Sequence, residues 1–129
     1  MLSMQTIWRD LVREVSTRSR DLYEFLSPAI DIYEDGNELV IAMDLPGFDK
    51  KKIRMRLTQD ALTVTASREQ DEFDGISYWE QRPLKVHRTI KLPVKVETEE
   101  ENLVATAKYE EGVLRIRLPI KGLGKVNLT

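Results

Sequence analysis

Residues 107–118 read AKYEEGVLRIRL and predict two β-strands joined by a short turn. In the second half, residues 113–118 alternate between apolar side chains and arginine, which is typical of a strand with one buried face. Residues 103–109 place apolar side chains at every second position as well. Between the two runs, Gly112 supplies the backbone freedom that a turn requires, and Pro119 ends the second strand.

The same period of two extends through most of the chain. Short alternating runs separated by turn residues occupy about residues 29–118, with no helical period among them. Seven or eight such strands indicate an antiparallel β-sandwich or barrel. The chain has no strand–helix–strand alternation, which argues against a doubly wound nucleotide-binding fold. The runs that precede the quoted segment are residues 30–32, 39–45, 53–57, 62–66 and 86–92.

The first part of the chain has a helical period. From about Met4 to Leu26 the apolar residues recur at steps of three and four, which predicts an amphipathic helix. Ser27 and Pro28 end the helix, because a residue before proline is disfavoured in helical conformation. The expected organisation is a helical arm over residues 1–27, a β-domain over 28–119 and a flexible C-terminal extension over 120–129. The apolar stripe includes Trp8, Leu11, Val15, Leu22 and Phe25.

Composition excludes several function classes. The 129 residues include no cysteine, so disulfides and thiolate metal sites are excluded. The net charge of −2 provides no general attraction for nucleic acid, and the basic residues within 50–56 are interpreted as a solvated face. No run of eighteen apolar residues is present, so we expect no membrane span. The N-terminus lacks a secretory pattern, so we expect a cytoplasmic protein.

Catalytic, metal and cofactor sites are not expected. His87 is the only histidine, and its neighbours supply neither a metal-binding set nor a triad, so we interpret it as a surface residue. The acidic run 97–101 lacks the spacing of a calcium loop. No phosphate-binding glycine motif is present. We therefore expect no cofactor and no enzyme activity.

Four segments together resemble the small heat shock (α-crystallin) family. Residues 107–114 resemble its A-x-x-x-(x)-G-V-L signature, and residues 44–48 resemble its acidic–Leu-Pro-Gly turn. Residues 87–93 resemble its arginine-bearing strand, and 126–128 its terminal I/V-x-I/V motif. The order and spacing are most similar to the short archaeal and bacterial members. The resemblance implies an immunoglobulin-like β-sandwich that forms dimers, and larger homo-oligomers assembled by the tail.

In this reading the tail is the oligomer anchor. Val126 and Leu128 are two residues apart on an extended segment, so both side chains point to the same side. The expected acceptor is a groove on another subunit between strands 53–57 and 113–118. The alternative is a frayed terminus with two incidental apolar residues. The expected groove residues are Ile53, Leu57, Leu114 and Ile116.

The resemblance also implies a dimer interface in the loop before the arginine strand. That loop would run from about residue 67 to 82, with 76–79 as a strand that pairs with the partner subunit. Arg88 lies on the apolar side of its strand and requires a carboxylate or carbonyls, with Glu80 as one candidate. The alternative is an edge arginine that reaches solvent. The expected interface residues are Tyr78, Trp79, Glu80 and Arg88.

The helical stripe has two expected uses and one alternative. It packs between subunits, or it contacts unfolding client proteins, unless it simply covers its own domain. The predicted function is an ATP-independent holding chaperone that acts as a dissociable oligomer. The rival is a CS-domain-like co-chaperone adaptor with one dedicated partner. Such adaptors typically lack both the Gly-Val-Leu turn and the V-x-L tail that are present here.

Overall fold

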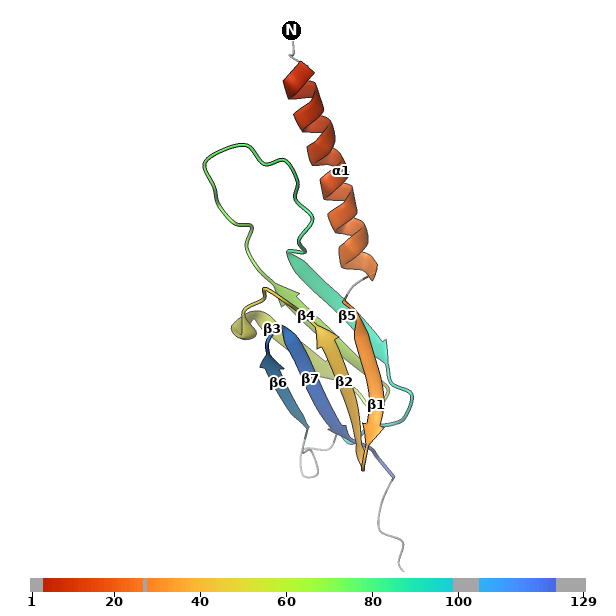
Figure 1. Cartoon of the computed structure of the whole chain (residues 1–129). Helices are drawn as coiled ribbons and strands as arrows, with labels where there is room; N and C mark the ends of the chain where they lie inside the picture. Colours follow the sequence, from red (N-terminus) through yellow and green to blue (C-terminus); the bar gives the residue numbers. More distant parts are fainter. Residues whose placement is uncertain (1–3, 27, 99–104, 123–129) are drawn as a thin grey trace, which may run out of the picture.

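The computed structural model describes residues 4–26, 28–98 and 105–122. One long helix precedes seven strands (Figure 1). The short 3₁₀ helix η1 lies immediately before β3. The elements are α1 (Met4–Leu26), β1 (Ile30–Asp35), β2 (Glu38–Asp44), η1 (Lys50–Lys52), β3 (Ile53–Leu57), β4 (Ala61–Ser67), β5 (Lys85–Lys91), β6 (Thr106–Glu110) and β7 (Val113–Pro119).

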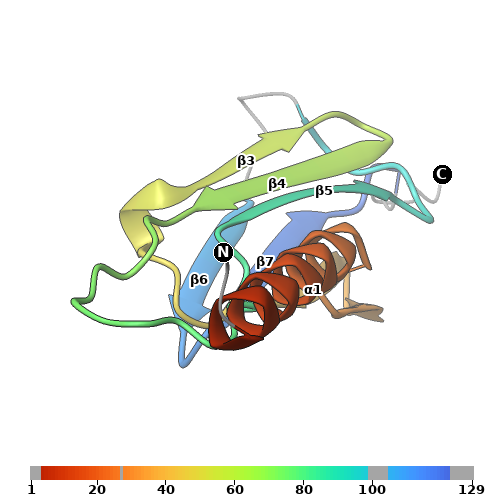
Figure 2. The ribbon, with the colours of Figure 1, turned by 90° about the horizontal axis from the view of Figure 1, so that it is seen from above.

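The strands form two antiparallel sheets that pack face to face (Figure 2). One sheet has the order β1-β2-β7-β6, and the other has the order β3-β4-β5. The chain crosses from the first sheet to the second after β2 and returns after β5. This confirms the predicted fold class, a β-sandwich with an N-terminal helix.

The core lies between the two sheets and is almost entirely aliphatic. In the first sheet, Ile41 pairs with Ile116 across β2 and β7, and both side chains are buried. In the second sheet, Val64 and Ile90 supply the facing layer. The alternation predicted from the sequence therefore sets which side of each strand is inside. Burial of these side chains provides the main stabilisation of the sandwich.

The turn between β6 and β7 depends on Gly112. Its φ is +76°, a left-handed conformation that favours glycine. A Cβ at this position would also lie 3.2 Å from the backbone Cα of Pro46. The residue that marks the family signature thus brings two turns of the sandwich into close approach.

α1 has the bounds predicted from its period, but it does not lie across the sandwich. It extends past one end of the sheets, beside the long loop of residues 68–84 (Figure 1). This loop contains no strand, including at the predicted positions 76–79. A strand there would need a pairing partner from outside the described chain, as the family resemblance implied.

The sandwich extends slightly beyond the predicted boundary at its C-terminal side. The N–H of Ile120 donates to the carbonyl oxygen of Asn37 at 2.9 Å, and the N–H of Lys121 donates to that of Lys95 at 2.9 Å. Ile120 also forms a β-bridge with Val96. The anchor residues Val126 and Leu128, and the predicted flexible extension from 123 onward, lie outside the described residues.

Candidate interaction surfaces

The apolar stripe of α1 faces solvent. Met4 is 81% exposed and Trp8 is 67% exposed, and the predicted stripe residues Leu11 and Val15 are exposed as well. The side chains of the other two predicted residues, Leu22 and Phe25, lie outside the described part of the structure. A helix stripe of this kind normally packs against a core, so its exposure needs an explanation.

A different face of α1 is directed toward the rest of the molecule. At about 3.6 residues per turn, the less exposed residues are centred about a quarter turn around the helix from Trp8. Ser16 is fully buried, and its hydroxyl donates to the carbonyl oxygen of Arg13 at 2.9 Å. Arg20 donates from Nη1 to Oε1 of Gln70 in the loop at 3.0 Å. The residues with reduced exposure are Thr6, Arg9, Val12, Ser16 and Arg20.

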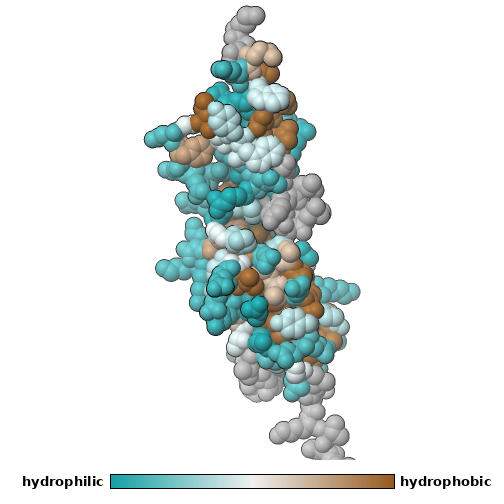
Figure 3. Space-filling model, in the orientation of Figure 1, coloured by the Kyte–Doolittle hydropathy of each residue, from teal (hydrophilic) through white to brown (hydrophobic). Residues whose placement is uncertain are grey.

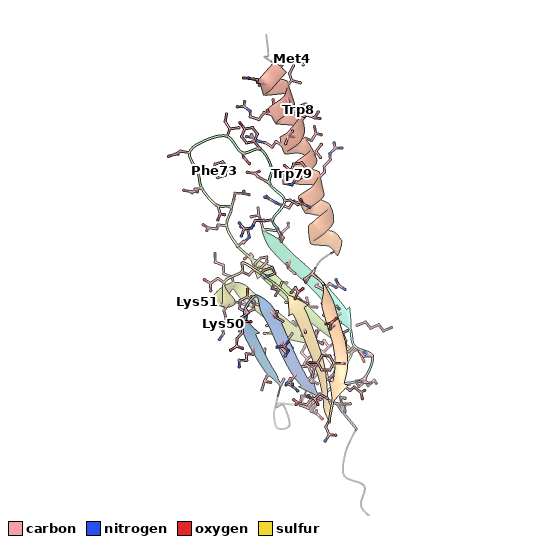
Figure 4. The ribbon with its side chains drawn as sticks, in the orientation of Figure 1. Met4, Trp8, Lys50, Lys51, Phe73 and Trp79 are labelled. Atoms are coloured by element: carbon pink, nitrogen blue, oxygen red, sulfur yellow. The ribbon has the colours of Figure 1, made fainter. Side chains whose placement is uncertain are left out.

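The neighbouring loop adds more exposed apolar side chains. Phe73, Ile76, Tyr78 and Trp79 are all exposed, with Tyr78 at 71%. Figure 4 shows Trp79 on the side of the loop that is nearer α1, and Phe73 on the far side. Figure 3 shows brown and pale side chains gathered over this part of the molecule. We call α1 together with residues 68–84 the projecting end.

The predicted dimer-interface residues are not gathered at one point in the described chain. Arg88 is on the inner side of β5, as predicted, and its Nη1 donates to the carbonyl oxygen of Pro28 at 3.0 Å. Glu80, its predicted partner, instead accepts from Nε2 of Gln70 at 3.3 Å. Arg88 therefore joins β5 to the segment that follows the helix. Tyr78 and Trp79 remain on the loop.

The predicted groove needs a correction in its second strand. Leu114 and Ile116 are 2% and 3% exposed, because β7 lies between β2 and β6 and directs these side chains into the core. They offer no surface to a groove. The strand at the edge of that sheet is β6, and Figures 1 and 2 place it on the same side of the sandwich as the edge strand β3.

The edge between β3 and β6 is open. Met55 shares the inward register of Ile53 and Leu57, yet it is 43% exposed. On β6, Ala107 pairs with the inward-facing Ile116 and is also exposed. Apolar positions that should face the core thus remain accessible along this edge. We call this the β3/β6 edge. Of the two residues predicted on β3, Leu57 is half-buried at this edge, whereas Ile53 is 8% exposed and belongs to the core; Met55 was not predicted.

A hollow lies at the end of the sandwich near the exit of α1. It has a volume of about 370 Å³ and is lined mainly by apolar side chains, with Arg68 and Arg82 also in its wall. Its apolar wall includes Leu45, Phe48 and Val86. The sequence did not reveal this hollow, because its lining comes from segments far apart in the chain.

Within the described ranges, no group of three or more histidine or carboxylate side chains gathers to hold a metal ion. His87 is exposed on the outer side of β5. No helix among the described residues is long and apolar enough to cross a membrane.

Comparisons with known proteins agree with this architecture. The model of the Hsp20/alpha crystallin family matches residues 31–125. A probable 15 kDa heat shock protein of Leptospira interrogans is 30% identical over 101 residues, which cover 78% of this chain and 75% of that protein. Small heat shock protein C4 of Rickettsia felis is 30% identical over 105 residues, covering 79% of this chain and 62% of that protein.

Solved structures give the same result. A Del-C4 mutant of hsp14.1 from Sulfolobus solfatataricus P2 is 50% identical, with a TM-score of 0.72 over 80% of this chain and 83% of that chain. Heat shock protein 16.0 from Schizosaccharomyces pombe has a TM-score of 0.61 at 22% identity, over 80% of this chain and 94% of that chain, and supports the fold alone. Because the family model spans nearly the whole sandwich, the chain belongs to the Hsp20/alpha crystallin family of small heat shock proteins, which are chaperones.

Proposed function

We propose that the protein is an ATP-independent holding chaperone that binds partly unfolded proteins and prevents their aggregation. The observation that carries the proposal is the projecting end, where a helix and a loop expose apolar side chains together. Such a surface binds the apolar segments that unfolding proteins expose, and the binding needs no nucleotide. The cytoplasm, where new and heat-damaged chains are abundant, is the proposed location.

The working particle is a dissociable homo-oligomer built from dimers. The loop around Tyr78 and Trp79 supports the dimer contact, since its side chains are exposed and its backbone lacks strand pairing in the described chain. In the assembled particle the apolar stripe of α1 packs between subunits. Loosening of the particle on heating then frees the stripe for clients.

The tail residues Val126 and Leu128 hold the larger particle together. Their proposed acceptor is the β3/β6 edge of another subunit, where Met55 is exposed and Leu57 is half-buried. Full burial of two aliphatic side chains is worth about 1.5–3 kcal/mol each before entropic costs. One anchor is therefore weak and reversible, but many anchors in one closed particle stabilise it.

The direct test measures aggregation of unrelated heat-denatured proteins by light scattering, without ATP. We expect substoichiometric protein to suppress aggregation. Trp8→Ala with Leu11→Ala should weaken suppression several-fold, because both side chains are exposed on the stripe. Gln5→Ala, an exposed polar position on the same helix, is the matched control. A monomer inactive toward every client would contradict the proposal and favour a dedicated adaptor.

The anchor is tested separately by particle mass. Deletion of residues 126–129 should reduce the oligomer to dimers, and Met55→Asp should do the same by placing a charge at the β3/β6 edge. Arg115→Asp, which places the same carboxylate on an exposed position of β7, is the control. An unchanged mass after the deletion would overturn the anchor assignment.

A further inference from the structure

The outer face of the β3-β4-β5 sheet has an unusual charge distribution. Every ionisable side chain in these three strands is a cation or a histidine, and none is a carboxylate. All of them except Arg88 lie on the outer side, in register with the hydroxyls of half-buried or exposed threonines. The ionisable residues are Arg54, Arg56, Lys85, His87, Arg88 and Lys91.

Strand pairing joins these side chains into one surface. Arg54 pairs with Thr65, which pairs in turn with His87 on β5. Two residues further along β3, Arg56 also faces outward and pairs with Thr63. The hydroxyl of Thr63 lies 3.1 Å from that of Thr89 on β5. The face is therefore a sheet surface of cations and hydroxyls, with no aromatic side chain among the strand residues that form it.

The turn before β3 extends the cationic face. Three lysines form η1, and Figure 4 shows Lys50 and Lys51 at the corner that leads into β3. Nη1 of Arg54 donates to the carbonyl oxygen of Lys51 at 2.5 Å, which fixes this turn against the strand. The nearby carboxylate of Asp49 accepts from the N–H of Lys51 at 2.9 Å, so it caps the turn. The other carboxylates near this face, Asp60 and Glu69, lie in the turns beyond the strands.

The opposite sheet is acidic at the edge formed by β1 and β2. Strands β1 and β2 carry carboxylates and no cation. The chain as a whole has a net charge of −2, so the cationic face reflects separation of charge within the molecule. A separated face of this kind produces a local field that attracts anions. The carboxylates are Asp31, Glu34, Asp35, Glu38 and Asp44.

We propose that the outer face of β3-β4-β5, with η1, binds the surface of an anionic lipid bilayer. A cationic face of three strands can contact several lipid head groups at once, and its hydroxyls can donate to their phosphates. Single-stranded nucleic acid is less suitable, because the face has no aromatic side chain on which bases stack. A duplex groove is read by a helix or a two-stranded ribbon, and this face presents neither.

The contact is peripheral and depends on charge. The outer face has no large apolar side chain to enter the hydrocarbon layer. Each lysine or arginine near an anionic surface strengthens association roughly fivefold. A homo-oligomer would present several such faces, which strengthens binding further through multivalency. The surface is separate from the projecting end, so it does not depend on the proposed client site.

The test is co-sedimentation of the full chain with vesicles of phosphatidylcholine alone or mixed with phosphatidylserine. We expect binding only to the mixed vesicles, and loss of binding at high salt. Arg56→Gln with Lys91→Gln should weaken binding by roughly twenty-fold, since two cations are removed. The control is Arg115→Gln with Lys121→Gln, which removes the same charge from exposed positions outside the face. The control should bind as the unchanged chain does.

Several outcomes would overturn the inference. These are no binding to the mixed vesicles at low salt, equal binding to neutral vesicles, or equal loss in both double variants. Binding to single-stranded RNA without binding to vesicles would replace the lipid with a nucleic acid. Both variants are assayed for suppression of client aggregation, which should remain intact. Loss of that activity in parallel would point to altered assembly instead of a lipid site.

Discussion

The sandwich and the projecting end differ in how far their apolar side chains are exposed to solvent. In the sandwich, Ile41 and Val64 have no exposed surface, whereas in the projecting end Met4 and Tyr78 remain largely exposed. The first part is complete within one chain, because its two sheets cover each other. The second part covers its apolar surface only by binding something else. The difference separates stability from the proposed function: the sandwich provides the first, and the projecting end is the proposed site of the second.

The largest expected effect tests this separation directly. Ile41→Ala removes a fully buried side chain from the middle of β2 and should lower the free energy of unfolding by about 2–5 kcal/mol. Trp8→Ala removes a larger side chain, but this side chain is exposed. The substitution should therefore change the free energy of unfolding by about 0.5 kcal/mol or less. Denaturant unfolding measures both, at a protein concentration low enough to dissociate the particle, so that packing of α1 between subunits does not contribute. A Trp8→Ala loss as large as that of Ile41→Ala would show that the helix is part of the core.

The next effect compares one glycine in each part. Gly112→Ala would force alanine into a left-handed φ and place its Cβ against the backbone of Pro46. The substitution should therefore lower the free energy of unfolding by about 2 kcal/mol or more. Gly75, in the loop, also has a positive φ but has nothing within 4 Å of its Cβ position. Gly75→Ala carries the strain of its own φ but lacks the contact with Pro46, so it should cost less than Gly112→Ala. The pair is measured by thermal unfolding, and equal losses would contradict the assignment of a close approach at Gly112.

A smaller effect concerns the junction between the two parts. Arg88→Met removes the hydrogen bond from Nη1 to the carbonyl oxygen of Pro28 and should cost about 1 kcal/mol. Hydrogen exchange should quicken at the neighbouring N–H of Asp44, which donates to the carbonyl oxygen of Ala29. Lys91→Met, on the outer side of the same strand, is the control. Unchanged exchange at Asp44 would show that the junction is held by other contacts.

The smallest effect is at a surface ion pair of the sandwich. Nη1 of Arg117 lies 3.0 Å from Oδ2 of Asp35 and 3.5 Å from Oε1 of Glu38. The hydrogen bond with Asp35 raises the pKa of Arg117, with the nearby carboxylates adding to this effect. A raised pKa on a base stabilises the fold at every pH below the unfolded-state pKa and loses that effect only as pH rises through the folded-state pKa.

Arg117→Gln should therefore have the same small effect throughout the neutral range, and the effect should shrink with added salt. Unfolding curves at several pH values and salt concentrations check this. A strong change between about pH 6 and 9 would mean that a different group titrates at this site.

Local patterns predicted the elements of the fold well. The helix bounds Met4–Leu26 and the strand Ile53–Leu57 follow from the period of their apolar residues and from the turn or proline beside them. Those signals depend only on neighbours in the chain. The inner position of Arg88 was predicted in the same way, because it shares the register of Val86 and Ile90.

The order of the strands in each sheet could not be predicted from the sequence pattern. The alternation in residues 113–118 indicates one buried face, but it does not tell a central strand from an edge strand. For this reason Leu114 and Ile116 were predicted to line a groove, although β6 is the strand at that edge. Met55 was missed for the same reason. Nothing near it in the sequence shows that β3 is an edge strand, where an inward-facing side chain can remain exposed. The common surface of Arg54, Thr65 and His87 likewise depends on strand pairing.

Because both sheets are open, four of the described strands have one side without a backbone partner: β1, β6, β3 and β5. Such strands can template the growth of another chain's strand, which is how many aggregates begin. Each of them carries charged side chains, for example Asp31 on β1 and Lys108 on β6. These charges oppose stacking of like strands in register. If the protein binds aggregating chains as proposed, these charges make it less able to seed a fibre itself.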